Sequence, residues 1–312
     1  MHIDKSQVKA WHACSEGYRW FLDKFPQGGT YADVHDALIA DKRYDDARWL
    51  VDQMYRTFLD SAEFIQAETA VTDKMVCELT RMKHPSDQVE GENSSGDYAQ
   101  IGSSGDYAQI GSSGDYARIG SSGDDARIGS SGDDARIGSS GYNARIGSSG
   151  YNARIGSSGY NARIGSSGNY ARIGSSGYNA RIGSSGNNAR IGSSGNYARI
   201  GSSGDDAQIG SSGYNAQIGS SGNYARIGSS GNYARIGSSG NYARITASGN
   251  GSVVACAGSV ERIVLGENGC ASVPWHDGKR IRIAVAYVGE NGIEANIPYY
   301  VNDEGQFVRV ED

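Results

Sequence analysis

The stretch GSSGYNARIGSSGYNARI, residues 138–155, is two copies of a nonapeptide, and close copies of it fill the middle of the chain. Isoleucine recurs every nine residues from Ile101 to Ile245, which gives 17 occurrences without a slip. The unit is Gly-Ser-Ser-Gly-x-x-Ala-(Arg/Gln)-Ile, in which the x-x pair draws on Asp, Tyr and Asn. Self-similarity at a short fixed period is typical of proteins whose units stack on one another.

Each unit has the pattern of a strand followed by a turn. Ala and Ile, two positions apart, share one face of an extended strand, and the Arg or Gln between them points to the opposite face. Gly-Ser-Ser-Gly then supplies a turn in which positive φ costs glycine little, whereas two glycines in nine residues would weaken a helix. We therefore expect a β-solenoid with Ile and Ala ladders inside, Ser rows at the turns and Arg rows outside.

Two questions about the repeat stay open. Gly- and Ser-rich tracts commonly serve as flexible linkers, but a linker has no physical reason to keep Ala and Ile in phase through every copy. Two nonapeptides make 18 residues, a coil length that suits a two-sided roll or a three-sided helix. Because odd and even repeats look alike, the sequence does not choose the number of strands per coil or the handedness.

The two ends of the chain depart from the repeat. In the first segment Thr30 is a candidate N-cap, and apolar residues from Val34 to Met54 recur at the spacing of two short helices joined near residues 42–45. The last segment alternates as strands separated by turns such as GENG and NDEGQ. The prediction is a mainly β fold with a small α-helical N-terminal domain (1–85), a linker (86–93), a nonapeptide-repeat β-solenoid (94–245), and a solenoid end with a small antiparallel β cap (246–312).

The formal net charge of −6 is unevenly distributed. Residues 1–93 carry 11 Lys and Arg against 17 Asp and Glu, residues 94–245 carry 13 Arg against 9 Asp, and residues 246–312 carry 5 against 9. The molecule is therefore a mildly basic rod between acidic ends. This profile neither demands nor excludes a nucleic-acid partner.

Cysteine usage and the absence of apolar segments indicate the compartment. The four cysteines lie far apart and form no CxxC pair, so we expect reduced, mostly buried thiols rather than disulfides or a zinc site. The N-terminus has no apolar core of a signal peptide, and no segment approaches the length that spans a bilayer. These features predict a soluble cytoplasmic protein without a membrane partner.

The residue types of catalytic sites form no recognisable arrangement. Five histidines include no HExxH motif, and His12 and Cys14, two positions apart on a helix, do not face each other. His276 and Asp277 lie at a predicted hairpin turn and lack a nucleophile. No Lys-Ser or Lys-Thr follows GSSG, as a phosphate loop would require. We expect no enzyme, no cofactor and no metal site.

The extended feature with binding chemistry is a ladder of Arg beside columns of Tyr. Regularly spaced Arg could follow a phosphate backbone while Tyr stacks on bases, or the ladder could form a protein-docking face. The alternative is a solvated face, because outward Arg above neighbouring Tyr and Asp stabilises the stack by pairing within it. The candidate binding residues are Arg118, Arg127, Arg136, Arg145, Arg154, Arg163, Arg172, Arg181, Arg190, Arg199, Tyr142, Tyr151 and Tyr160.

The period of nine resembles the calcium-binding β-roll of secreted bacterial toxins, whose repeat is G-G-x-G-x-D-x-U-x. Here Asp takes that place only in some copies, so most turns lack the oxygen ligands that Ca²⁺ needs. The phrase ARIGSSGxxARIG is also similar to trimeric adhesin heads, which are exported, and to ice-nucleation rods, which present Thr-rich rows instead of Arg and Tyr.

Two further stretches carry a wider resemblance: ACSEGYRWFLDKFPQGGTYADVHDAL at 13–38 and WHDGKRIRIAVAYVGENGIEANIPYYVNDEGQF at 275–307. They resemble uncharacterised proteins of bacteria and phages that have a helical N-terminal region, near-identical short repeats and a C-terminal β cap. The resemblance covers nearly the whole chain and implies no catalytic residue. It implies an accessory protein of a mobile element.

The favoured expectation is a rigid, non-enzymatic interaction protein. It would be a phage or mobile-element effector, such as a host-defence inhibitor, that docks on a host protein complex and inhibits or modulates it. Self-association into a homo-oligomer is a further expectation. The alternative is a solenoid that binds or mimics nucleic acid through its Arg, Tyr or Asp ladders, and an enzyme hidden in an end domain is the third hypothesis.

Overall fold

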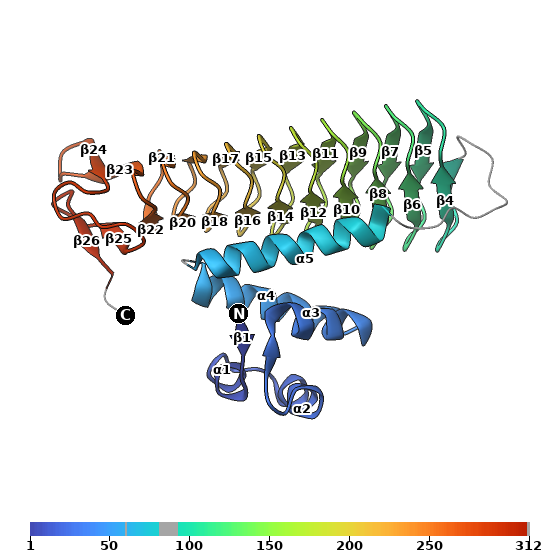
Figure 1. The fold of residues 1–312 in the computed structure, drawn as a ribbon, viewed down its shortest axis with the longest axis horizontal. Helices are drawn as coiled ribbons and strands as arrows, with labels where there is room; N and C mark the ends of the chain where they lie inside the picture. Colours follow the sequence, from blue (N-terminus) through green and yellow to red (C-terminus); the bar gives the residue numbers. More distant parts are fainter. Residues whose placement is uncertain (60, 81–92, 311–312) are drawn as a thin grey trace.

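The computed structural model describes residues 1–59, 61–80 and 93–310. Most of the predicted linker, residues 86–92, lies outside these ranges, and Asn93 begins the first strand of the rod. The chain forms a two-sided β-solenoid with a helical region along one side and antiparallel strands at its C-terminal end (Figure 1). The predicted mainly β solenoid fold is therefore confirmed.

Each nonapeptide contributes one four-residue strand, Arg/Gln-Ile-Gly-Ser, and pairs in parallel with the strand two repeats away. Ile155, for example, aligns with Ile137 on one side and Ile173 on the other. One coil is thus 18 residues with two strands, and the alternation places successive repeats in opposite sheets. Of the two coil shapes that the sequence left open, the structure has the two-sided roll.

The strands belong to two sheets, which we call the covered sheet and the open sheet. In the covered sheet they are β4 (Gln100–Ser103), β6 (Arg118–Ser121), β8 (Arg136–Ser139), β10 (Arg154–Ser157), β12 (Arg172–Ser175), β14 (Arg190–Ser193), β16 (Gln208–Ser211), β18 (Arg226–Ser229) and β20 (Ala243–Ala247). In the open sheet they are β3 (Asn93–Ser94), β5 (Gln109–Ser112), β7 (Arg127–Ser130), β9 (Arg145–Ser148), β11 (Arg163–Ser166), β13 (Arg181–Ser184), β15 (Arg199–Ser202), β17 (Gln217–Ser220), β19 (Arg235–Ser238) and β21 (Val253–Cys256).

The interior between the sheets is built from three ladders. Ile and Ala are buried in nearly every coil, as predicted. The first Ser of each unit is also inside: Ser139 and Ser157 are fully buried. The strand continues from Ile through Gly to this Ser. Because Ile and Ser are two positions apart, both side chains point to the inner face. The expectation that the Ser rows lie at the turns is therefore right only for the second Ser, such as the exposed Ser140.

The turns use positive φ at a different residue from the one predicted. The second residue of the x-x pair takes it, for example Asn143 at 55° and Tyr170 at 58°, while the repeat glycines do not. Asn and Asp tolerate this region better than other non-glycine residues, which accounts for their frequency there. The prediction that assigned positive φ to the Gly-Ser-Ser-Gly segment was wrong; its last glycine is required by contact between coils instead.

The helical region has five helices within the described ranges: α1 (Lys5–Ala10), α2 (Ser15–Lys24), α3 (Tyr31–Ala40), α4 (Tyr44–Phe58) and α5 (Ala62–Thr80). The predicted pair of short helices corresponds to α3 and α4, and Thr30 caps α3 by accepting the Asp33 N–H at 3.2 Å. Strands β1 (His2–Ile3) and β2 (Gly29–Thr30) pair antiparallel beside them. None of these helices is long and apolar enough to cross a membrane.

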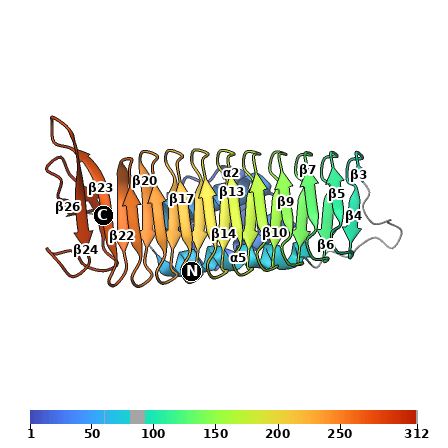
Figure 2. The same cartoon turned by 90° about the horizontal axis from the view of Figure 1, so that it is seen from above.

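Helix α5 runs along the covered sheet and contacts its strands from β6 to β18 (Figure 1). The open sheet faces away from the helices, and Figure 2 looks onto it with the helices behind. The two faces of the rod therefore have the same sequence but different environments.

The C-terminal strands extend both sheets beyond the repeats. They are β22 (Val260–Leu265), β23 (Cys270–His276), β24 (Ile281–Tyr287), β25 (Pro298–Val301) and β26 (Phe307–Arg309). Strands β25 and β26 add antiparallel to the covered sheet, and β24 adds antiparallel to β23 of the open sheet. The predicted antiparallel β end is confirmed, and it pairs edges that parallel stacking would otherwise leave open.

All four cysteines are free thiols, but only Cys256 is buried. Its burial raises the pKa of the thiol to about 12. Cys14 is exposed and accepts the Gly17 N–H at the start of α2, at 3.2 Å. The expectation of mostly buried thiols was therefore wrong for three of the four positions.

Candidate functional site

The predicted Arg ladder is divided between the two faces of the rod. Because successive repeats lie in opposite sheets, every second Arg falls on the same face. Arg118, Arg136, Arg154, Arg172 and Arg190 belong to the covered sheet, and Arg127, Arg145, Arg163, Arg181 and Arg199 belong to the open sheet. The sequence could not show this division, since the strand residues of odd and even repeats are the same.

On the covered sheet, guanidinium groups bind the helical region. Arg226 forms a salt bridge of 2.6 Å with Asp52 of α4. Arg190, only 9 % exposed, donates to the backbone carbonyl of Arg48 at 2.7 Å. The expectation that the Arg rows lie outside was therefore wrong for the middle of this sheet. The physical reason is that the acidic helical region packs against the basic rod.

A cluster of polar groups is enclosed where α3 and α5 meet the covered sheet. Glu68, 8 % exposed, accepts a hydrogen bond from the Tyr31 hydroxyl. Burial and the nearby Glu68 carboxylate raise the pKa of Tyr31, while the Arg190 guanidinium opposes them. His35, 6 % exposed, lies with Nε2 3.3 Å from Nη1 of Arg172. The first contact joins α3 to α5 and the second joins α3 to the rod, both through groups that are costly to leave unpaired.

We expect His35 to make folding stability fall at mildly acidic pH. Burial lowers its pKa well below the usual value, and Arg172, Arg190, Arg154 and Lys74 lower it further. As pH falls below about 6.5, His35 is protonated in the unfolded chain but stays neutral in the folded chain. Proton binding then stabilises the unfolded state, so the free energy of unfolding is highest at neutral pH and decreases below about pH 6.5. Between pH 6.5 and 5.5 the loss is up to about 1 kcal/mol.

The measurement is urea unfolding of the wild type and His35→Gln at both pH values. Gln keeps an acceptor for Arg172 but does not titrate, so His35→Gln should lose less stability on acidification. Equal losses in the two proteins would show that His35 does not carry this pH dependence.

On the open sheet, the Arg side chains project into solvent. We call Arg127, Arg145, Arg163, Arg181, Arg199 and Arg235 the Arg column of the open sheet; all six are exposed. In the part of the chain that the structure describes, none of the six forms a salt bridge. Within the described residues, the column is therefore a row of positive charges exposed to solvent and without an ion pair.

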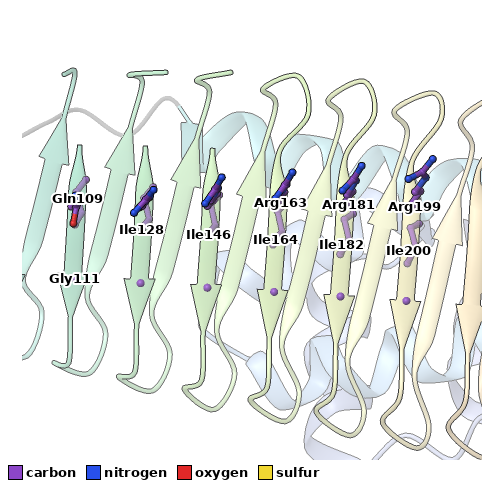
Figure 3. Close-up of a pocket in the computed structure, with 18 of the residues that line it drawn as sticks. Gln109, Gly111, Ile128, Ile146, Arg163, Ile164, Arg181, Ile182, Arg199 and Ile200 are labelled. Carbon is purple, nitrogen blue, oxygen red and sulfur yellow. The ribbon is translucent and has the colours of Figure 1, made fainter. Parts of the chain in front are cut away.

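Beside the Arg column runs a column of outward-facing glycines, one per strand. A Cβ placed at Gly129, Gly147, Gly165, Gly183 or Gly201 would meet no atom within 4 Å. The two columns line an open groove of about 1040 Å³ that extends from β5 to β17 (Figure 3). Its floor is strand backbone, and its wall is a row of guanidinium groups.

A run of tyrosines follows the turns that lead into the open-sheet strands; we call it the Tyr edge. Its rings contact one another in sequence, with centroids 5.1 to 5.9 Å apart. The members are Tyr142, Tyr160, Tyr178, Tyr197, Tyr214 and Tyr233. The last four were missed from sequence, because Tyr alternates between the two x positions and the face of each repeat was unknown.

Predicted Tyr151 does not join this edge. It belongs to the turns that lead into the covered sheet, where its ring contacts Tyr170 at 5.1 Å. The guanidinium of Arg48 from α4 lies 4.6 Å from the Tyr170 ring centre. Of the three predicted tyrosines, Tyr142 and Tyr160 therefore lie beside the open sheet and Tyr151 lies beside the helical region.

The remaining chemical candidates have structural roles. Asp277 accepts the N–H groups of Lys279 and Arg280, at 2.9 and 2.8 Å, and these bonds with that to Arg282 lower its pKa to about 2. His276 accepts the Gly278 N–H through Nδ1 at 3.0 Å. Both residues therefore build the predicted turn. Within the described ranges, no three His, Cys, Asp or Glu side chains gather as a metal site would require.

Comparison with known proteins finds relatives of parts of this chain. Residues 1–59 match the YdhT N-terminal domain family. The uncharacterised protein YdhT of Escherichia coli strain K12 is 37% identical over 102 residues, which are 33% of this chain and 36% of that protein. An ice nucleation protein of Pseudomonas syringae is 58% identical over 36 residues, 12% of this chain and 3% of that protein. No solved structure gives a significant match.

The predicted resemblance to uncharacterised bacterial proteins with a helical N-terminal region is thereby confirmed. The chain spans about a third of the length of the first of these curated relatives and far less of the ice nucleation protein.

Proposed function

We propose that the chain is a non-enzymatic docking protein whose open sheet binds a protein partner. The observation that carries this proposal is the covered sheet, where the same repeat surface already binds an acidic helical region through Arg226 and Arg190. The open sheet offers the same strands with exposed Arg and no occupant from the described residues. A rigid stack loses little conformational entropy on binding, which favours such a surface.

The setting of this activity is part of the proposal. We propose a cytoplasmic accessory protein of a phage or mobile element that docks on a host complex and modulates it; the resemblance of residues 13–38 and 275–307 supports this. Two open sheets placed face to face would bring like charges together. Any homo-oligomer is therefore proposed to use another surface, and the partner of the open sheet to be a different protein.

Nucleic acid is the second candidate, because the Arg column lies beside six Tyr rings in contact. Guanidinium groups that follow a backbone and aromatic rings that stack on bases are the two components of single-strand binding. This candidate makes a distinct prediction: binding should weaken steeply with salt and tolerate changes of base sequence.

The test removes three charges from the open sheet. We expect the combined variant Arg145→Gln, Arg163→Gln and Arg181→Gln to lose at least about 10-fold in affinity for the partner, since charge-assisted contacts dominate such a face. The control is Lys5→Gln, Lys9→Gln and Arg19→Gln, which removes three exposed charges from the helical region. Partners are captured from host lysate with the full chain, identified by mass spectrometry and re-measured in purified form.

Three outcomes separate the candidates. Loss of a stoichiometric protein partner in the open-sheet variant, with retention in the control, supports protein docking. Salt-dependent binding of nucleic acid that the open-sheet variant loses supports the second candidate. Binding that both variants retain would place the activity away from the open sheet.

A further inference from the structure

Helix α5 shows how a helix fits this repeat surface. It lies over the outward glycines of the covered sheet: a Cβ at Gly174 would come 2.5 Å from Cγ2 of Thr72, and one at Gly228 would come 2.9 Å from Cγ1 of Ile65. The absence of a side chain at these positions lets the helix contact the strand backbone. The glycine column therefore provides a contact surface for a helix and is not a sign of flexibility. We call this column, together with the Arg column beside it, the helix seat.

The residues of α5 that occupy this seat share one helix face. Ile65, Thr69, Thr72 and Val76 follow one another at intervals of four, three and four, the spacing of a single stripe. They are β-branched and compact, so the helix axis can approach the sheet closely. At the side of the stripe, Arg172, Arg190 and Arg226 bind polar groups of the helical region.

The open sheet repeats both parts of this seat. Its repeat strands have the same Arg/Gln-Ile-Gly-Ser sequence in the same 18-residue register, so its Arg and Gly columns run side by side as those of the covered sheet do. The groove reaches from β5 to β17, seven strands of that sheet. At about 4.8 Å per strand this is roughly 29 Å, and a helix of the length of α5 is about 28 Å long.

The charge of the open sheet identifies the kind of helix that fits. Five exposed Arg line its groove, and the sixth member of the Arg column, Arg235, lies beyond the groove in β19. The helical region of the described chain packs on the other face. None of the described helices is left to cover the open sheet, so we take the occupant to be a helix of another protein; it would carry carboxylates beside its stripe to neutralise the Arg column.

We propose that the open sheet binds an acidic amphipathic α-helix of a partner protein, with compact residues lying on the glycine column and carboxylates facing the Arg column. This inference rests on the proposed function and adds the shape and chemistry of the bound segment.

The test uses a defined probe on the full chain. The probe is a fluorescent, side-chain-stapled helical peptide with the sequence of residues 61–80 and Cys77 replaced by Ser, which keeps the stripe and the four acidic residues of the segment. A peptide of the same composition with the stripe residues scattered around the helix is the control. Binding is measured by fluorescence anisotropy.

Two variants of the open sheet divide the outcomes. Gly147→Leu with Gly165→Leu and Gly183→Leu fills the seat without changing charge, and the Arg145, Arg163 and Arg181 to Gln variant removes charge without filling it. We expect each to weaken probe binding at least 10-fold, as expected when a seat is blocked or a charge pair is lost, and the scattered peptide to bind no variant. Folding of the Leu variant is checked by circular dichroism.

Failure of this inference differs from failure of the proposed function. If the natural partner is lost on Arg→Gln but retained on Gly→Leu, the open sheet docks protein in another manner and the helix seat is wrong. If the probe binds the Leu variant with the affinity that it has for the wild type, it binds away from the glycine column of the open sheet, which also overturns the inference. If a single-stranded oligonucleotide displaces the probe, and if the Gly→Leu variant still binds that oligonucleotide, the groove is a nucleic-acid site.

Discussion

Replacing Gly174 by Leu is expected to detach α5 from the rod, whereas the same replacement at Gly165 is expected to leave the fold intact. Both glycines occupy the third position of a strand and point outward, one on each sheet. A Cβ at Gly174 would lie 2.5 Å from Thr72 and 2.9 Å from Val76, while one at Gly165 would meet nothing within 4 Å. The pair therefore compares one substitution in two environments.

The expected magnitudes follow from the contacts. A bulky side chain at Gly174 must push the helix off the sheet, and overpacking of this kind costs about 3 kcal/mol. At Gly165 the change replaces a flexible residue in a strand, which is neutral or stabilises by about 0.5 to 1 kcal/mol.

Hydrogen exchange of the α5 amides measures the difference. With Gly174→Leu they should exchange roughly 100-fold faster than in the wild type, and with Gly165→Leu at the wild-type rate. Equal exchange in the two variants would show that the glycine column does not seat the helix.

The period of nine was sufficient to predict the rod, its inner Ile and Ala ladders and its strand unit, because a stacked core is the physical reason to keep those residues in phase. It was not sufficient to predict which repeats share a face. Arg163 and Arg172 have the same neighbours in sequence, yet one is exposed and the other touches His35. That difference arises from the position of the helical region, which depends on contacts 100 or more residues apart in sequence, such as that of Arg172 with His35 of α3.

The candidate site was predicted in residue type but not in grouping. Arg145 and Tyr142 were both expected to bind, and the structure places them at the same sheet. The glycine beside each Arg was regarded only as part of a turn, since a sequence does not show that an outward glycine makes room for a helix. Once the register is known, the strand pattern identifies this surface: Ile and Ser are buried, so the Arg and Gly that alternate with them share the outer face.

The last glycine of the Gly-Ser-Ser-Gly segment has a separate role, and its loss is the other large effect that we expect. Gly168 does not have positive φ, so alanine there meets no backbone strain of its own. A Cβ at this position would, however, lie 1.9 Å from the carbonyl oxygen of Gly150 in the preceding coil. That oxygen belongs to backbone that parallel pairing on both sheets holds in place, so it cannot move without separating the coils.

We therefore expect Gly168→Ala to destabilise the rod by more than about 3 kcal/mol, because the clash is with backbone rather than with a side chain that can rotate. Gly165→Ala, three residues earlier with open space around it, is the control and should be neutral or slightly stabilising. Thermal unfolding followed by circular dichroism should show a midpoint lower by roughly 6 to 12 °C for Gly168→Ala alone. If the two alanine variants have the same thermal midpoint, coil spacing does not depend on this glycine. The Gly-Ser-Ser-Gly segment would then be an ordinary flexible turn, as its composition alone indicates. Because the same short approach recurs at Gly159 and Gly177, we expect the repeat to keep its glycine for the spacing of coils and not for flexibility.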